Sequence, residues 1–161
     1  MKKEVLEYRF AKENDVNKIF NFIKELAVYE KMEDEVVATE ELLHNWLFVE
    51  KKAEVIFALE EGKEVGFALF FHNFSTFLGR GGIYLEDMFV LPSYRGRGYG
   101  KGLIKTLAKI ALERNCGRLE WTCLDWNKQS IDFYLSLGAK PMEEWRIYRL
   151  QGKSLEEVIN K

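Results

Sequence analysis

Cysteine, histidine and proline are all scarce in this chain, with two of each among 161 residues. Cys116 and Cys123 are too far apart for a CxxC pair, and two histidines add too few donors for a tetrahedral zinc site. Two cysteines also make no disulfide framework. We therefore expect no bound metal and a reducing, cytoplasmic location.

An excess of either charge and a long apolar run are also missing. Lysine and arginine total 24 against 26 aspartates and glutamates, which gives a formal charge of -2. This balance predicts no nucleic-acid or membrane partner, so any basic site is local. No window approaches the length of a membrane span, and Glu4 and Glu7 interrupt the stretch where a signal peptide is apolar.

What the sequence contains is the composition of one globular domain. Apolar residues make up 47% and charged residues 31%, and no linker, repeat or low-complexity segment divides residues 1–161. Periodicity predicts strands at 4–10, 53–60, 64–74, 83–90, 118–124 and 145–150, and helices at 16–27, 40–47, 103–112 and 129–137, with a last helical turn from 154. This order predicts an α/β domain with a mixed, partly antiparallel sheet and helices on its faces.

Polar residues precede the first two predicted helices as candidate N-caps. Asn14 or Asp15 is expected to cap the helix at 16–27, and Thr39 the helix at 40–47. The segment 29–41 between them is acidic and has no period until Thr39, so it predicts a loop.

A glycine-rich loop follows the predicted strand at 83–90. Its glycines alternate, so that backbone N–H groups can converge on an anion at the start of the next helix: Gly96, Gly98, Gly100 and Gly102. The dinucleotide pattern G-x-G-x-x-G and the P-loop spacing are both absent. Nearby cations favour a polyphosphate ligand: Arg95, Arg97, Lys101, Lys105 and Lys109. A tight packing turn beside a solvated basic face is the alternative.

The glycine loop carries a resemblance to a known superfamily. Residues 95–100, Arg-Gly-Arg-Gly-Tyr-Gly, match the R/Q-x-x-G-x-G/A signature of the GNAT N-acetyltransferases. More closely, the chain resembles the spermidine/spermine (diamine) and thialysine N-acetyltransferases, in segments that span nearly the whole chain: 23–27, 29–30, 84–87, 89–90, 94–96, 125–127, 133–134, 137–139 and 145–146. The resemblance implies a mostly antiparallel sheet with the phosphate-binding loop between a strand and the long helix, acetyl-CoA as co-substrate, no metal, and a homodimer.

The activity that the resemblance implies is acetyl transfer to a primary amine of a small polycationic or diamine substrate, a polyamine or a thialysine-like molecule. Two alternatives stay open at this point. One is acetylation of a protein or peptide amine, and the other is an acyl-CoA-binding sensor without catalysis.

Two sets of residues are predicted to hold the co-substrate. The resemblance places the pyrophosphate on the loop and the pantetheine arm along the backbone of the preceding strand: Met88, Phe89, Val90, Arg95, Gly96, Arg97, Gly98, Tyr99, Gly100 and Lys101. Asn127, Ser130 and Tyr134 form the pattern Asn-x-x-Ser-x-x-x-Tyr, which resembles the CoA-contacting segment of the family. Asn127 also suits a helix cap.

Proton transfer needs a base and an acid. An alkyl ammonium has a pKa near ~10, so a carboxylate close to the attacking amine is useful. Glu86 is the predicted base because it lies just before the loop and resembles the family carboxylate; an outward-facing strand carboxylate is the alternative. Asp87 is expected to alternate to the other face and is the second candidate. Tyr134 resembles the family acid that protonates the CoA thiolate, although its spacing alone suits a half-buried core tyrosine.

Acceptor binding is predicted from acidic and aromatic residues. Tyr29, Glu30 and Trp145 resemble acceptor-side positions of the family, and Glu86 and Asp87 complete this set. The acidic residues of 30–35 are also candidates to attract a second, non-reacting ammonium; an exposed acidic loop that serves only solubility is the alternative.

Overall fold

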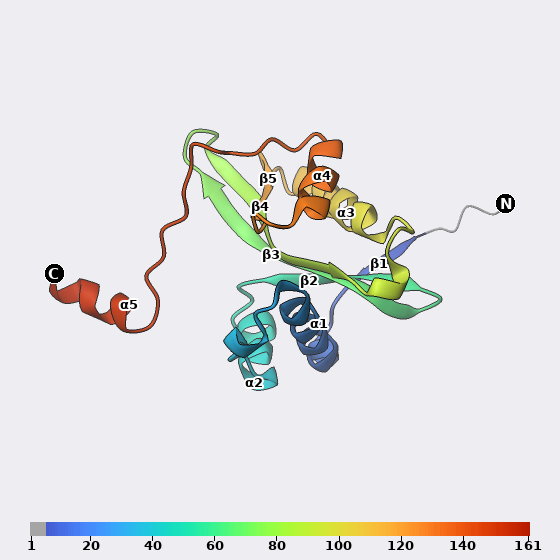
Figure 1. Cartoon of the computed structure of the whole chain (residues 1–161), viewed down its shortest axis with the longest axis horizontal. Helices are drawn as coiled ribbons and strands as arrows, with labels where there is room; N and C mark the ends of the chain where they lie inside the picture. The colour runs from blue at the N-terminus through green and yellow to red at the C-terminus, as the bar shows by residue number, and fades with distance from the viewer. Residues whose placement is uncertain (1–5) are drawn as a thin grey trace. The chain divides into compact units, whose positions relative to one another are not determined.

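Residues 6–161 are described by the computed structural model, whose chain divides into two compact units, Met1–Thr122 and Cys123–Lys161 (Figure 1). The first unit holds the sheet and the second holds two short helices. Residues 4 and 5 of the first predicted strand lie outside the described residues. That residues 1–161 form one domain stays a prediction.

The sheet of the first unit has five strands in the order β1-β2-β3-β4-β5. The first three junctions are antiparallel and the last is parallel, so the predicted mixed, mostly antiparallel sheet is confirmed. The strands are β1 Glu7–Phe10, β2 Glu54–Glu60, β3 Lys63–Ser75, β4 Arg80–Val90 and β5 Leu119–Trp121. The tight turn between β2 and β3 has positive φ at Glu61 and Gly62, as a two-residue hairpin requires.

Helices cover both faces of this sheet. Figure 1 shows α1 (Val16–Glu30) and α2 (Glu40–His44) on one side and α3 (Tyr99–Glu113) on the other. The core under α1 combines apolar side chains of α1 and of the turn after α2 with those that alternate along the strands: Ile19, Phe22, Leu26, Leu47, Val55, Phe57, Phe67 and Phe89. A π-helical turn (Asn45–Val49) continues α2, so the segment 40–47 is helical throughout, as predicted. The glycine loop therefore joins the end of β4 to the start of α3, as predicted.

One predicted strand is present but begins earlier than expected, and another is absent. The strand predicted at 83–90 begins earlier, because β4 starts at Arg80 and includes Gly81 and Gly82. A Cβ on Gly82 would lie 2.5 Å from Asn73 Oδ1 on β3, so close strand packing selects this glycine. The predicted strand at 145–150 is absent, because an alternating pattern forms a strand only where a neighbour pairs with it, and none of the five strands does.

The two N-cap predictions have different outcomes. Thr39 caps α2, since its Oγ1 accepts a hydrogen bond from Leu42 N at 3.2 Å. Asp15 precedes α1 but its side chain forms no cap. Its Oδ2 accepts instead from the backbone N–H of Lys12, outside the helix, at 2.7 Å.

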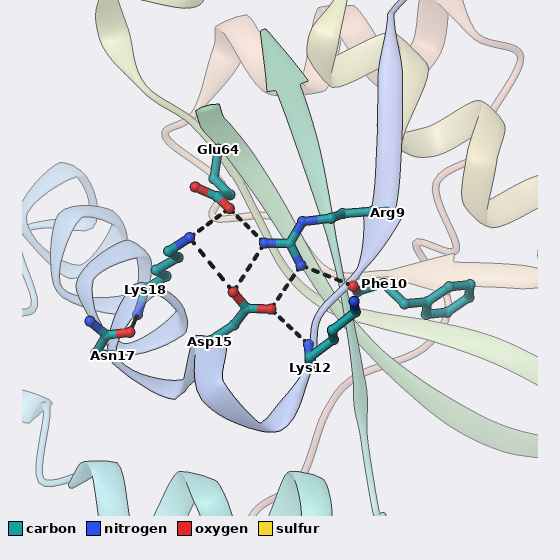
Figure 2. Close-up of polar contacts among 7 residues, drawn as sticks. All are labelled: Arg9, Phe10, Lys12, Asp15, Asn17, Lys18 and Glu64. Carbon is teal, nitrogen blue, oxygen red and sulfur yellow. Dashed lines mark hydrogen bonds and ion pairs between the residues drawn. The ribbon is translucent and has the colours of Figure 1, made fainter. Parts of the chain in front are cut away.

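Asp15 is engaged by a network of charges that ties β1, α1 and β3 together (Figure 2). Both of its oxygens accept from the Arg9 guanidinium, at 2.7 and 3.0 Å. Glu64 on β3 accepts from Arg9 and, at 2.7 Å, from the Lys18 ammonium. Two carboxylates thus share two cations, and the side chain of Asp15 is only 6% exposed.

The second unit carries the last two helices. Asn127 caps α4 (Lys128–Ser136), because its Oδ1 accepts from Ser130 N at 3.3 Å. α5 spans Lys153–Glu157 and contains the predicted last helical turn. Several large apolar side chains between 142 and 159 are exposed, Tyr148 by 91%.

Candidate active site

The candidate site begins where β4 leaves β5. The parallel pairing ends at Leu85 opposite Trp121, whereas β4 continues to Val90. β3 pairs with Met88, Phe89 and Val90 on the other side. Beyond Leu85, the described strands leave one main-chain edge of β4 uncovered, which is the arrangement that an added extended ligand requires.

A β-bulge lies at the same point of β4. Leu69 of β3 pairs with Asp87 and the next residue, Phe70, pairs with Leu85, so Glu86 has no partner on β3. The bulge breaks the alternation from which Asp87 was expected to take the face opposite Glu86. Glu86 is exposed and Asp87 is half-buried.

Asp87 lies on the α1 face of the sheet. Paired residues of an antiparallel ladder share a face, and its partner Leu69 packs against the core under α1, as does Phe89 two residues on. Burial, then the charges of Glu86 and Glu30, raise the pKa of Asp87 to about 6. Burial also raises the pKa of Glu30, the last residue of α1.

Within the part of the chain that the structure describes, these three carboxylates form no ion pair with a cation. Among residues 6–161, no lysine, arginine or histidine forms an ion pair with Glu30, Glu86 or Asp87. The repulsion among like charges without a counter-charge is relieved by protonation or by a cation from outside the chain. The structure thus brings together three of the predicted acceptor residues.

Tyr29 joins this group through ring contacts. Its ring centroid lies 6.2 Å from that of Phe89 on β4. The guanidinium of Arg95, from the loop after β4, lies over both rings, 4.9 Å from Tyr29 and 5.0 Å from Phe89. Arg95 Nε also donates to the carbonyl of Val90 at 2.9 Å, so that carbonyl already has a partner.

The glycines of the loop are required for different physical reasons. Gly96 and Gly98 have φ of +75° and +94°, values that residues other than glycine rarely adopt. Gly98 is the N-cap of α3, and the first intrahelical bond runs from Gly102 N to Gly98 O at 2.9 Å. The N–H groups of Gly100 and Lys101 precede that bond and have no acceptor within the helix, as an anion site needs.

Gly102 does not belong to the anion cradle, which corrects the prediction that all four glycines serve it. A Cβ there would overlap the Tyr8 hydroxyl, which donates to the carbonyl of Tyr99 at 3.2 Å. Gly102 therefore lets β1 and α3 approach. Burial of the Tyr8 phenol raises its pKa to about 12.

Gly102→Ala and Gly100→Ala are expected to act oppositely, although both add one methyl to α3. The first forces Tyr8 to move and should lower the free energy of unfolding by about 1–3 kcal/mol. A Cβ added to Gly100 would meet no heavy atom within 4 Å, so alanine there should raise stability by up to about 1 kcal/mol. Urea unfolding measures both. Equal effects on unfolding would contradict the assignment.

The two arginines among the predicted phosphate cations are engaged within the chain. Arg97 donates to Glu60 Oε1 at 2.9 Å, and the Tyr99 hydroxyl donates to the same oxygen at 2.9 Å. Glu60, at the end of β2, was not predicted as part of the site, because only its contact across the sheet reveals it. It fixes the loop to the β2–β3 hairpin. Lys101 is exposed at the start of α3.

The predicted residues of the second unit lie on α4 and beyond it. Asn127, Ser130 and Tyr134 occupy the cap and first turns of α4, and the cap role of Asn127 is observed. Tyr134 is half-buried, with its ring 5.5 Å from that of Phe133. Trp145 is 75% exposed. Their roles toward co-substrate and acceptor stay predictions.

The described residues contain neither a cluster of metal ligands nor a membrane-spanning helix. Within 6–161, no three histidine, cysteine, aspartate or glutamate side chains gather as metal ligands. None of the helices described is long and apolar enough to cross a membrane.

Comparisons with known proteins agree with this geometry. The acetyltransferase (GNAT) family pattern matches residues 15–139. The chain is similar to the thialysine N-epsilon-acetyltransferase of Bos taurus, with 40% identity over 165 positions that cover 95% of this chain and 96% of that protein. It is also similar to the spermidine/spermine N(1)-acetyltransferase-like protein 1 of Homo sapiens, with 33% identity over 96% of this chain and 24% of that protein.

A solved structure extends the likeness to three dimensions. An integron cassette protein from the mobile metagenome of V. cholerae superposes with a TM-score of 0.80 at 32% identity, covering 97% of this chain and 98% of that one.

Proposed function

The chain belongs to the GNAT family and is an acetyl-CoA-dependent amine N-acetyltransferase, and on this premise we propose that its acceptor is a small dicationic amine, a polyamine or a thialysine-like molecule. The observation that carries the proposal is the group of three carboxylates without a cation partner among the described residues: Glu30, Glu86 and Asp87. One ammonium is the reacting group, and a second is bound by the remaining negative charge.

Acetyl-CoA in this proposal binds along the uncovered edge of β4 and across the glycine loop. The N–H groups of Gly100 and Lys101 supply donors for the pyrophosphate at the start of α3. The pantetheine arm adds to β4 at 88–90 as an extended strand would. This direction brings the thioester toward the bulge, where the carboxylates lie. Asn127 and Ser130 complete the co-substrate contacts.

The proposed reaction is direct attack of the amine on the thioester. Glu86 takes the first proton, because it is the exposed bulge residue at the uncovered edge of β4. Nitrogen bonds to the acetyl carbon, and the C–S bond breaks. The CoA thiolate leaves with a proton from Tyr134, and the nitrogen gives up its second proton to restore that tyrosine. Asp87 and Glu30 bind ammonium, with Tyr29 and Trp145 on the acceptor side.

A homodimer, which the resemblance implies, is part of the proposal. Light scattering on the full chain checks it, and a molar mass of one chain at working concentration would contradict it.

Glu86→Gln and Asp87→Asn are expected to change different kinetic constants. Loss of the base should lower kcat most at low pH, where free amine is scarce. Asp87, with its pKa of about 6, gains a proton as the pH falls through that value, so the KM of the dication should rise below about pH 6 in the unmutated protein. Asp87→Asn should abolish that rise. An unaltered kcat profile in Glu86→Gln would remove it as the base.

A free-thiol release assay with acetyl-CoA tests the function itself. Spermidine, spermine, putrescine, thialysine, lysine and a lysine-containing peptide are compared, with protein-free reactions as background. Turnover on a small diamine supports the proposal. Turnover on the peptide alone would identify a protein acetyltransferase, and acetyl-CoA binding with silence on every amine would point to a sensor.

A further inference from the structure

We propose that Arg95 is a positioning residue, which holds the amine-binding end of α1 against the co-substrate strand β4, and is not a ligand of the CoA phosphates. The inference rests on the proposed function, because it assigns an acceptor side to α1 and a co-substrate side to β4.

The contacts of Arg95 reach both sides at once. Its Nε donates to the carbonyl of Val90, the last residue of β4, at 2.9 Å. Its Cζ lies 4.9 Å from the Tyr29 ring centroid and 5.0 Å from that of Phe89. The two rings are 6.2 Å apart and tilted by 59°. The guanidinium therefore contacts two aromatic rings and the end of β4 at the same time. A planar cation suits this arrangement, because it can stack on rings while its N–H groups donate hydrogen bonds.

The ring of Tyr29 connects these contacts to the acceptor carboxylates. Tyr29 precedes Glu30, at the end of α1, where Lys31 closes the helix in the left-handed conformation with φ of 59°. Glu30 is one of the charges that raise the pKa of Asp87. A shift of Tyr29 away from Phe89 would therefore move Glu30 relative to Asp87, and with it the negative charge that binds the ammonium.

Arg97, the other arginine of the loop, is also held by contacts within the chain. The guanidinium of Arg97 is paired with Glu60 and lies 5.2 Å from the Tyr94 ring centroid. Both arginines of the loop thus contact the chain, and the phosphate donors that remain are backbone N–H groups and exposed Lys101. Arg95 takes no proton and forms no bond in the reaction.

Kinetics with two different thioesters distinguish a positioning role of Arg95 from a phosphate-binding role. S-acetylpantetheine carries the same thioester arm as acetyl-CoA but no nucleotide or pyrophosphate. Arg95→Lys keeps the charge but loses the planar fork. We expect it to raise the KM of the diamine about tenfold with either thioester, because misplaced binding groups weaken recognition. The KM of acetyl-CoA should change by less than about threefold, since one phosphate contact would cost more.

Matched variants complete the design. Lys101→Met, a change to an exposed cation of the same loop, should weaken acetyl-CoA and leave S-acetylpantetheine unaffected. Tyr29→Leu removes one of the two rings and should reproduce the Arg95→Lys effect on the diamine. The double variant should be no worse than either single one, since both disrupt one contact. Thermal unfolding verifies that each variant is folded.

The outcomes distinguish this inference from the proposed function. A loss in Arg95→Lys that appears with acetyl-CoA and vanishes with S-acetylpantetheine would overturn positioning and make Arg95 a phosphate ligand. Unchanged diamine KM with both thioesters would also overturn it. Failure of the proposed function would give a different result, because the unmutated protein would then release no thiol with any amine. Calorimetric affinities for the diamine in both proteins then test Arg95 without turnover, and equal affinities overturn the inference.

Discussion

Replacing Tyr134 by phenylalanine is expected to lower kcat by about 100-fold, because a positioned general acid contributes about 10²–10⁴ in rate. The change removes one oxygen from a half-buried ring on α4 and keeps its contact with Phe133. The dissociation constant of acetyl-CoA should stay within about threefold, because the lost group acts on charge that develops only as the thiolate leaves. Stopped-flow thiol release and calorimetry measure the two quantities.

Tyr148 offers the matched control for this variant. It belongs to the same unit and is 91% exposed, so Tyr148→Phe should leave both kcat and acetyl-CoA affinity unchanged. Full turnover in Tyr134→Phe would remove Tyr134 as the acid. A parallel loss of acetyl-CoA affinity would make it a binding residue instead.

Asp15→Asn is expected to lower the free energy of unfolding by about 2 kcal/mol, or Tm by about 4–8 °C. The carboxylate is almost fully buried and accepts hydrogen bonds from Arg9 at 2.7 and 3.0 Å and from Lys12 N. Asparagine keeps one acceptor and loses the charge, which leaves Arg9 and Lys18 sharing Glu64 alone. Denaturant unfolding at pH 7 gives the difference directly.

The pH dependence of stability is a second, independent test of the same network. The hydrogen bonds from Arg9 are the largest cause that lowers the pKa of Asp15 to about 2. A folded pKa below the unfolded value of about 3.9 adds stability that is fully present above about pH 5 and is lost as the pH falls toward about 2. In Asp15→Asn this part of the acid transition should disappear. Asp34→Asn, at an exposed site, should keep it, and identical acid profiles for all three proteins would contradict the account.

The order of elements could be predicted from the sequence because local periodicity carries it. The runs that became α1 and α3 repeat at helical spacing, and the strands at 54–60 and 63–75 flank a turn with Gly62. The strand predicted at 145–150 failed for the opposite reason. Alternation describes a strand that could pair, whereas pairing depends on a neighbour that the pattern does not contain.

The site could be predicted only in part. The loop signature has glycines at 96 and 98, where the backbone adopts positive φ, because that conformation is a local demand of the chain. Gly102 looked like a member of the same series, but Tyr8, far away in sequence, is what requires it. The bulge at Glu86 is likewise invisible in the chain, because it exists only in the register between β3 and β4.

Contacts of charged side chains were the least predictable feature. Asn14 or Asp15 was expected to cap a helix, and Arg97 to bind phosphate, because each residue type suits that task at that position. Arg9 and Glu60 compete for them from other strands. Such partners can be found only once the sheet brings them together.

In the proposed function, the carboxylates of Glu30, Glu86 and Asp87, which have no cation partner within 6–161, select a dicationic amine for acetylation. The most direct measurement compares kcat/KM for the best diamine in the thiol-release assay with kcat/KM for the monoamine of the same chain length that lacks its second amino group. We predict a ratio of at least about tenfold in favour of the diamine, which corresponds to about 1.4 kcal/mol of recognition. Equal values for the two amines would contradict the claim.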